Sequence, residues 1–283
     1  MIKDNVRWIV QSYDEKKDKA GQEYWNVTWN NSPLPNVWNV DSMGVSNYVE
    51  YKLFHWIAET LEKLGKIGPA VHLVEVGCAR SQALPVLAKR LNISVAGMDY
   101  SPNGCQQTEA MMRREGVVGP VYCLDIFSVP ANLKERFDVV ISFGLIEHFS
   151  DTNEIVTALA GLLKSGGVIF TNIPNMRGTT GFFQKLLNRE IYDIHIPLTP
   201  PQVRVAHEEA GLSVIESGYF LSNNYGVVNI GGKRNNLAWW VKKITLAIFA
   251  RMSMLLWLLD IKLGGLPVSQ EFSPYVNCVA ERK

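Results

Sequence analysis

Short apolar segments alternate with helical stretches through the middle of the chain, and this alternation limits the fold more than any other feature of the sequence. Segments of strand length lie at 71–76, 94–98, 121–123, 137–143 and 167–172, and helical spacing occupies 82–91, 105–115 and 152–163. Strands and helices in this order build parallel β-α-β units, whose helices cover both faces of the sheet. The sequence therefore predicts an α/β fold with a doubly wound, mostly parallel sheet.

The two ends of the chain depart from this alternation. Residues 1–43 are rich in Trp, Asn and Pro and predict an irregular cap with at most a short helix. A capping-box pattern at Asn47 and Glu50 opens an amphipathic helix that Gly65 ends. A helix at 200–210 and strands at 213–219 and 275–280 follow the core. We therefore expect an N-terminal cap and helix over residues 1–65, and one domain over 66–283 with an apolar helical insertion at about 237–263.

Charge and cysteine usage exclude several classes of protein. The 283 residues carry 28 Lys and Arg against 27 Asp and Glu, so no broad basic field favours binding to nucleic acid. Hydrophobic residues make up 47% of the chain, which excludes intrinsic disorder. The four cysteines are scattered, without a C-x-x-C pair or histidines at metal-ligand spacing, so we expect free thiols and no metal site. Because the N-terminal residues lack the apolar core of a signal peptide, we expect a cytoplasmic protein.

Acidic and small residues follow the ends of the first three predicted strands of the sheet. The first strand ends at Glu75 and Val76 and passes through Gly77, Cys78, Ala79, Arg80 and Ser81 directly into a helix. Small residues at such a turn let the backbone approach a nucleotide-like ligand. Asp99 ends the second strand, where a carboxylate accepts ribose hydroxyls, and Asp125 with the backbone of Ile126 is placed to bind adenine. NAD and S-adenosylmethionine both fit an acidic residue at this position, but the G-x-G-x-x-G fingerprint of dinucleotide binding is missing.

These features, in this order, resemble the class I S-adenosylmethionine-dependent methyltransferases, in the subgroup with quinone and small-molecule O-methyltransferases. The resemblance is carried by Glu75-Val76-Gly77, Asp99, Leu124-Asp125-Ile126, Phe137-Asp138-Val139-Val140 with Glu147-His148, and Leu163-Lys164-Ser165-Gly166-Gly167. It implies a Rossmann-like methyltransferase fold and S-adenosylmethionine as cofactor. The implied cofactor-binding residues are Glu75, Gly77, Cys78, Ala79, Asp99, Tyr100, Asp125, Ile126 and Phe143. The family usually has glycine where this chain has Ala79 and Ser81, which makes the turn bulkier.

Two histidines are candidates for the base of a methyl transfer to an alcohol. His148 follows the fourth strand and His195 follows the fifth, so both lie at the carboxyl edge where an open parallel sheet binds ligands. Structural roles are the alternative for each. Aromatic residues of the cap (Trp25, Trp29, Trp38, Tyr48 and Tyr51) suit either stacking on an acceptor or packing among themselves.

The resemblance implies O-methylation of a small-molecule, glycan or lipid-linked acceptor. The alternative is a non-catalytic binding or assembly subunit that docks on a membrane or partner, which the bulkier turn favours.

Residues 244–259 are almost entirely apolar, with Arg251 as their one charge. Sixteen residues fall short of the roughly twenty needed to span a bilayer, so we do not expect a transmembrane helix. Three interpretations stay open: a buried lid or core helix, a helix in the plane of a membrane anchored by Trp and Lys, and the interface of a homodimer. The second would place the protein peripherally on the membrane.

Overall fold

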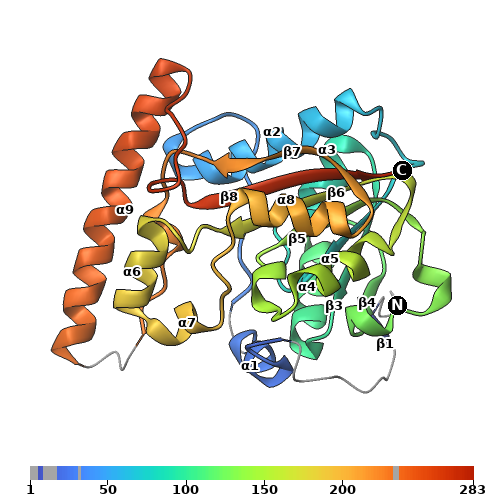
Figure 1. The fold of residues 1–283 in the computed structure, drawn as a ribbon, viewed down its shortest axis with the longest axis horizontal. Helices are drawn as coiled ribbons and strands as arrows, with labels where there is room; N and C mark the ends of the chain where they lie inside the picture. The colour runs from blue at the N-terminus through green and yellow to red at the C-terminus, as the bar shows by residue number, and fades with distance from the viewer. Residues whose placement is uncertain (1–5, 9–17, 31–32, 232–235) are drawn as a thin grey trace.

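The computed structural model describes residues 6–8, 18–30, 33–231 and 236–283. Within them, eight strands form one sheet in the order β1-β4-β3-β2-β5-β6-β8-β7 (Figure 1). The strands are β1 (Val6–Trp8), β2 (His72–Val76), β3 (Ser94–Asp99), β4 (Val121–Cys123), β5 (Phe137–Phe143), β6 (Leu163–Pro174), β7 (Leu212–Phe220) and β8 (Tyr275–Arg282). The pairs from β1 to β6 are parallel, whereas β8 runs antiparallel to both β6 and β7. The predicted doubly wound α/β sheet is confirmed.

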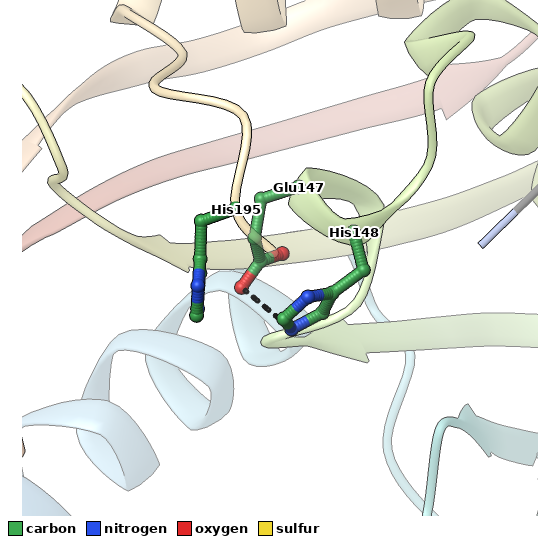
Figure 2. A group of neighbouring side chains, drawn as sticks. All are labelled: Glu147, His148 and His195. Carbon is green, nitrogen blue, oxygen red and sulfur yellow. Dashed lines mark ion pairs between the residues drawn. The ribbon is translucent and has the colours of Figure 1, made fainter. Parts of the chain in front are cut away.

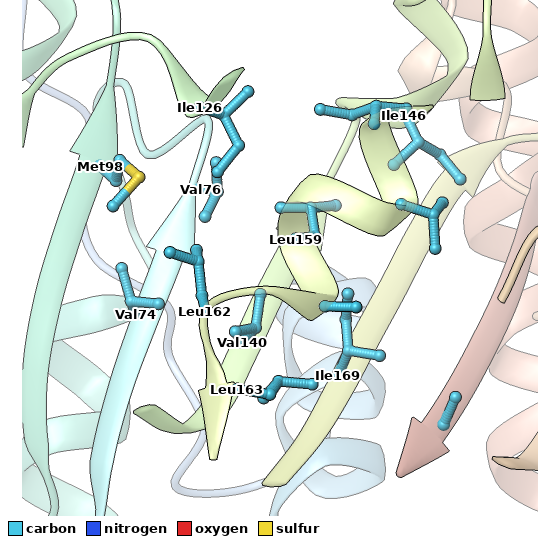
Figure 3. Close-up of a cluster of buried hydrophobic side chains, with 14 of the residues drawn as sticks. Val74, Val76, Met98, Ile126, Val140, Ile146, Leu159, Leu162, Leu163 and Ile169 are labelled. Carbon is cyan, nitrogen blue, oxygen red and sulfur yellow. The ribbon is translucent and has the colours of Figure 1, made fainter. Parts of the chain in front are cut away.

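Helices cover both faces of the sheet. Successive strand residues point to opposite sides, so each strand contributes side chains to both layers of packing. Leu73, Val139 and Phe170 pack with α2 (Tyr48–Lys63), α3 (Leu84–Leu91) and α4 (Pro102–Arg114) on one face. Val74, Val140 and Ile169 pack with α5 (Thr152–Ala160) and α8 (Pro200–Glu209) on the other (Figure 3). Strands buried on both faces read as continuous apolar runs, which is why the sequence located them.

The N-terminal region differs from the expected irregular cap. Strand β1 extends the sheet beside β4, and α1 (Gln22–Thr28) lies over the carboxyl ends of the strands. The expected capping box of α2 is wrong. Asn47 instead accepts a hydrogen bond from the Gly44 amide (2.8 Å), and the Glu50 carboxylate accepts one from the Asn39 amide (3.1 Å). Both side chains thus bind the segment that precedes α2 instead of capping the helix.

Two helices lie outside the predicted pattern, and a third coincides with the predicted helical insertion at about 237–263. After β6 come α6 (Thr179–Leu187) and α7 (Arg189–Asp193), and between β7 and β8 stands α9 (Leu237–Leu263). At 27 residues α9 is long and apolar enough to cross a membrane, so the expectation that this segment is too short is wrong. The Asn236 side chain caps the start of the helix by accepting a hydrogen bond from the Ala238 amide (2.6 Å). The helix therefore also includes the residues on both sides of 244–259, which the count of sixteen apolar residues left out.

Of the three interpretations left open for this segment, the buried lid or core helix is wrong. Only 11% of its most apolar window is buried inside the protein. Figure 1 shows α9 at the outer left edge of the molecule, beside α6.

Candidate functional site

Buried side chains hold the turn between β2 and α3 from the side of the protein core. Gly77 has a φ of 76°, a conformation that favours glycine, and its amide donates to the Met98 carbonyl (2.9 Å). Ser81 donates its hydroxyl to the Glu75 carboxylate and accepts from the Leu84 amide (3.0 Å). Burial raises the pKa of Glu75 to about 7. The serine that departs from the family pattern therefore fixes this turn and does not fill the space above it.

Asp99 lies where the loops after β2 and β3 meet. Its Oδ2 accepts from the Ala79 amide (3.0 Å) and its Oδ1 accepts from the Ser101 amide (2.8 Å). Burial raises its pKa to about 6, against the lowering effect of these backbone hydrogen bonds. Each carboxylate oxygen keeps a further lone pair, so Asp99 is able to accept ligand hydroxyls as well.

Two adjoining cavities open at the carboxyl edge of the sheet. The first has about 340 Å³ and the second about 380 Å³ of empty space, counting the part that is open to solvent. The first is lined by Val76, Gly77, Met98, Asp99, Tyr100, Leu124, Asp125, Ile126, Leu145 and Phe149. The second is lined by Asp18, Trp25, Trp29, Gly77, Ala79, Asp99, Tyr100, Gly144, Leu145, His148 and Phe149. We call them cavity 1 and cavity 2; they share Gly77, Asp99, Tyr100, Leu145 and Phe149.

The structure brings most of the predicted cofactor residues to these cavities. Gly77, Asp99, Tyr100, Asp125 and Ile126 line cavity 1, and Ala79 lines cavity 2.

Three predicted residues line neither of these two cavities. Glu75 is buried beneath the turn, and Cys78 is fully buried in the core. Phe143 stacks on Trp38, with ring centroids 6.5 Å apart. A role in cofactor binding stays a prediction for these three.

The N-terminal segment 18–30 closes over cavity 2. Asp18 accepts hydrogen bonds from the Trp25 indole (3.1 Å), the Ala20 amide (2.8 Å) and the Tyr100 hydroxyl. The Gln22 amide group donates to the Tyr100 carbonyl (2.6 Å). Sequence reasoning drew attention to the tryptophans of this segment but missed Asp18, since no local motif marks an isolated aspartate.

Glu147, His148 and His195 form a cluster beside cavity 2, in which Glu147 and His148 are buried and His195 is half-buried (Figure 2). Helix η4 (Ile146–His148) follows β5 and supplies two of them, and the loop after α7 supplies the third. His148 Nδ1 donates to the Ile194 carbonyl (3.0 Å), and His195 Nδ1 donates to the Ile191 carbonyl (2.5 Å). These partners leave the lone pair of each imidazole on Nε2.

Burial sets the charge of the cluster. It lowers the pKa of His148 and of His195 to about 4 and raises the pKa of Glu147 to about 8. A Glu147 oxygen lies 3.9 Å from His148 Nε2, and within the described residues neither carboxyl oxygen has a hydrogen-bond partner. At neutral pH the cluster therefore consists of two neutral imidazoles and a carboxyl group that keeps its proton.

The same three side chains are able to hold a metal ion. They offer ligand atoms that all lie within 4.8 Å of one another, and two imidazoles with a carboxylate are a common set for divalent transition metals. Spacing along the sequence could not reveal this group, because His195 comes from a distant loop. The expected lack of a metal stays a prediction.

Comparisons with known proteins agree with this geometry. A family model described as a methyltransferase domain matches residues 74–171, the strands that carry most of the predicted cofactor residues. The ubiquinone biosynthesis O-methyltransferase of Methylobacterium nodulans is 29% identical over 167 residues. That match covers 56% of the chain and 66% of the relative, slightly less than two thirds of the relative's length.

Two solved structures share the fold across most of the chain. A putative sarcosine dimethylglycine methyltransferase from Galdieria sulphuraria superposes with a TM-score of 0.60 at 16% identity, covering 93% of this chain and 98% of that one. A geranyl diphosphate C-methyltransferase from Streptomyces coelicolor, with Mg²⁺, geranyl diphosphate and S-adenosyl-L-homocysteine, gives 0.56 at 17%, with the same coverages of 93% and 98%.

The sheet order and the cavities at its carboxyl edge define a Rossmann-like fold built to bind an adenosyl cofactor. The chain therefore resembles the class I S-adenosylmethionine-dependent methyltransferases: residues 74–171 match a methyltransferase domain, and the fold is shared with solved methyltransferases.

Proposed function

We propose that the protein transfers a methyl group from S-adenosylmethionine to the hydroxyl oxygen of a small-molecule acceptor bound in cavity 2. The observation that carries this proposal is the position of His148, which lines cavity 2 together with Asp99 and Ala79. A proton acceptor and a cofactor-binding turn thus face one cavity. The relative from Methylobacterium nodulans, whose name specifies O-methylation, supports the choice of oxygen.

Adenosine fits cavity 1 by the chemistry of its walls. Asp99 accepts the ribose hydroxyls, and Asp125 with the Ile126 amide binds the edge of adenine. Val76, Met98 and the other apolar side chains of cavity 1 would contact the faces of the ring. Gly77 and Ala79, which line cavity 2, would hold the methionine part of the cofactor.

S-adenosylmethionine supplies an activated methyl group, so this chain contributes chiefly position and proton transfer. Segment 18–30 excludes water from cavity 2 and holds the acceptor in line with the methyl group. His148 Nε2 accepts the hydroxyl proton. The Glu147 carboxylate, 3.9 Å from that nitrogen, stabilises the imidazolium that forms. The cluster must therefore lose the proton of Glu147 before it is able to take one from the acceptor.

The walls of cavity 2 favour a neutral, planar acceptor. Trp25 and Trp29 stack with ring centroids 5.9 Å apart and present aromatic surface to the cavity. Among the described residues that line it, none is a lysine or arginine, whereas Asp18 and Asp99 are both acidic. A carboxylate acceptor would meet these two acids, so a ring that carries a hydroxyl is the better fit.

The alternative of a non-catalytic assembly subunit rested on the bulk of Ala79 and Ser81. Ser81 is 5% exposed and bonded to Glu75 beneath the turn, so it takes no space from the cofactor. Ala79 lines cavity 2 without closing it. No observation at the site favours this alternative.

The test is methyl transfer to a panel of hydroxylated aromatic compounds, followed by intact mass. We expect the gain of one methyl group on at least one compound, and a fall in turnover of about 100-fold for His148→Ala. His72→Ala, an exposed histidine at the start of β2, is the matched control and should leave turnover unchanged. Calorimetric binding of S-adenosyl-L-homocysteine with full turnover in His148→Ala would refute the assigned base, and methylation at nitrogen or carbon would refute the acceptor class.

A further inference from the structure

One side of α9 holds the helix to the rest of the protein along its length. Lys242 Nζ donates to the Leu187 carbonyl (2.7 Å), and Ser253 Oγ accepts from the Tyr225 amide (3.0 Å). Trp257 Nε1 donates to the Asn223 carbonyl (2.9 Å). Near the helix end, Asp260 forms an ion pair with Lys52 (3.3 Å). These contacts follow helical spacing and define the inner side of α9.

The opposite side of α9 is a largely apolar surface without a partner in the described structure. We call it the outer face; its exposed side chains are Leu237, Trp240, Val241, Ile244, Ile248, Met252, Leu255, Leu258, Leu259 and Leu263. Leu255 is 62% and Ile244 59% exposed. Phe182 and Leu186 of the neighbouring α6 are exposed too, and α6 touches α9 where Phe183 meets Phe249, with ring centroids 4.4 Å apart. A surface of this size on a soluble domain marks an interaction site.

The charges of the outer face indicate what it binds. Arg251 and Lys262 lie within it at helical spacing, and Lys243 lies 5.1 Å from the rings of Trp239 and Trp240. Asp260, the sole acid of α9, is on the inner side and paired with Lys52. A second copy of this face would bring like charges together in an apolar contact. Lipid phosphates are complementary, because long basic side chains reach them while the apolar residues enter the acyl region.

The helix is inserted at the carboxyl edge of the sheet, where the cavities lie. Phe220 at the end of β7 pairs with Tyr275 at the start of β8, and Tyr275 also pairs with Pro174 at the end of β6. Since β2, β5 and β6 are parallel, Pro174 and Gly77 are at the same edge. Both attachments of the segment with α9 therefore lie on the side from which an acceptor enters.

We propose that the outer face of α9, with the exposed apolar residues of α6, docks in the plane of an anionic phospholipid bilayer. The helix lies on the membrane and does not cross it, because the inner-side contacts tie it to the domain from Lys242 to Asp260. Docking places the carboxyl edge beside the lipid headgroups, where an acceptor with an apolar chain is available to cavity 2. The inference does not depend on the proposed chemistry.

The test is co-sedimentation of the full chain with vesicles of phosphatidylcholine alone and of phosphatidylcholine mixed with phosphatidylglycerol. We expect binding to the mixed vesicles, and a loss of at least about 10-fold in Ile248→Glu/Leu255→Glu. Val118→Glu places one glutamate on a residue that is 84% exposed outside α9, and should bind as the unchanged protein does. Arg251→Glu/Lys262→Glu should lower binding to the mixed vesicles by about 10-fold or more.

Circular dichroism and binding of S-adenosyl-L-homocysteine show whether each variant is folded. Equal sedimentation of the double glutamate variant and the unchanged protein would overturn the proposal. A protein that ignores both vesicles, but is dimeric in sedimentation equilibrium and monomeric as Ile248→Glu/Leu255→Glu, would overturn it in favour of a homodimer. Neither result would affect the proposed methyl transfer, which is measured separately.

Discussion

The charge of Glu147 is expected to control the pH dependence of turnover. Burial raises its pKa to about 8, and the proposed mechanism requires the ionised form. The ionised fraction of such a group rises about 50-fold between pH 6 and pH 8. We therefore expect kcat/KM to rise by about this factor with a neutral acceptor and to level off above pH 8. His148 and His195, whose pKa values are lowered to about 4, stay neutral across this range and add no step.

The decisive variant is Glu147→Gln, which keeps the shape of the side chain and removes its ionisation. Its kcat/KM should be low and nearly independent of pH, whereas His72→Ala should keep the full profile. Stability gives a second readout of opposite sign. Unfolded protein ionises Glu147 near its ordinary pKa of 4.5, but the folded protein keeps the proton to about 8, so the free energy of unfolding falls as pH rises between these values. Glu147→Gln should remove that part of the fall; a rising rate profile that persists in Glu147→Gln would refute the reasoning.

Three further predictions concern the cofactor site. Asp99→Asn should weaken binding of S-adenosyl-L-homocysteine by about 10-fold in calorimetry, since a charged acceptor for the ribose is lost; unchanged affinity would contradict that role. Gly97→Ala should destabilise the fold by about 1–3 kcal/mol in denaturant unfolding, because the added Cβ would lie 2.7 Å from Cys78 Sγ, and Cys78→Ala should restore much of the loss. Asp18→Asn should expose segment 18–30 to limited proteolysis even with S-adenosyl-L-homocysteine bound, whereas equal protection would show that Asp18 does not hold this segment closed.

The sheet could be predicted because each strand is recognisable from the residues of its own segment. Strands buried on both faces must be apolar throughout, and predicted 137–143 matches β5 residue for residue. Predicted 167–172 extends in the structure to Leu163–Pro174, since β8 also pairs with Ile173 and Pro174, and Phe137 of β5 pairs with Leu163. Strand β1 escaped prediction because three residues at a sheet edge carry too little periodicity to be recognised.

The candidate site likewise contains some residues whose positions the sequence could predict and others whose positions it could not. Asp99 and Asp125 directly follow strands that the sequence located, so their meeting at one edge could be inferred from parallel topology. The contact between the rings of His148 and His195, with centroids 4.4 Å apart, depends on how the loop after α7 returns to η4. Asp18 and Tyr100, which share a hydrogen bond, lie 82 residues apart in the sequence, and no local pattern predicts their contact. Long-range loop packing decides these positions, and a single sequence holds little information about it.

The cofactor and the acceptor depend on different parts of this chain. The residues placed at the cofactor follow β2, β3 and β4, inside the range 74–171 that matches the methyltransferase family. Asp18, Trp25 and Trp29 of cavity 2, and the whole of α9, lie outside that range. Likeness to known enzymes therefore informs the choice of cofactor far more than the choice of acceptor. Substitutions in segment 18–30 should change which acceptor is methylated, and substitutions on the outer face of α9 should change only how a membrane-borne acceptor is reached, because the turn at Gly77 and the Asp99 carboxylate are built without either segment.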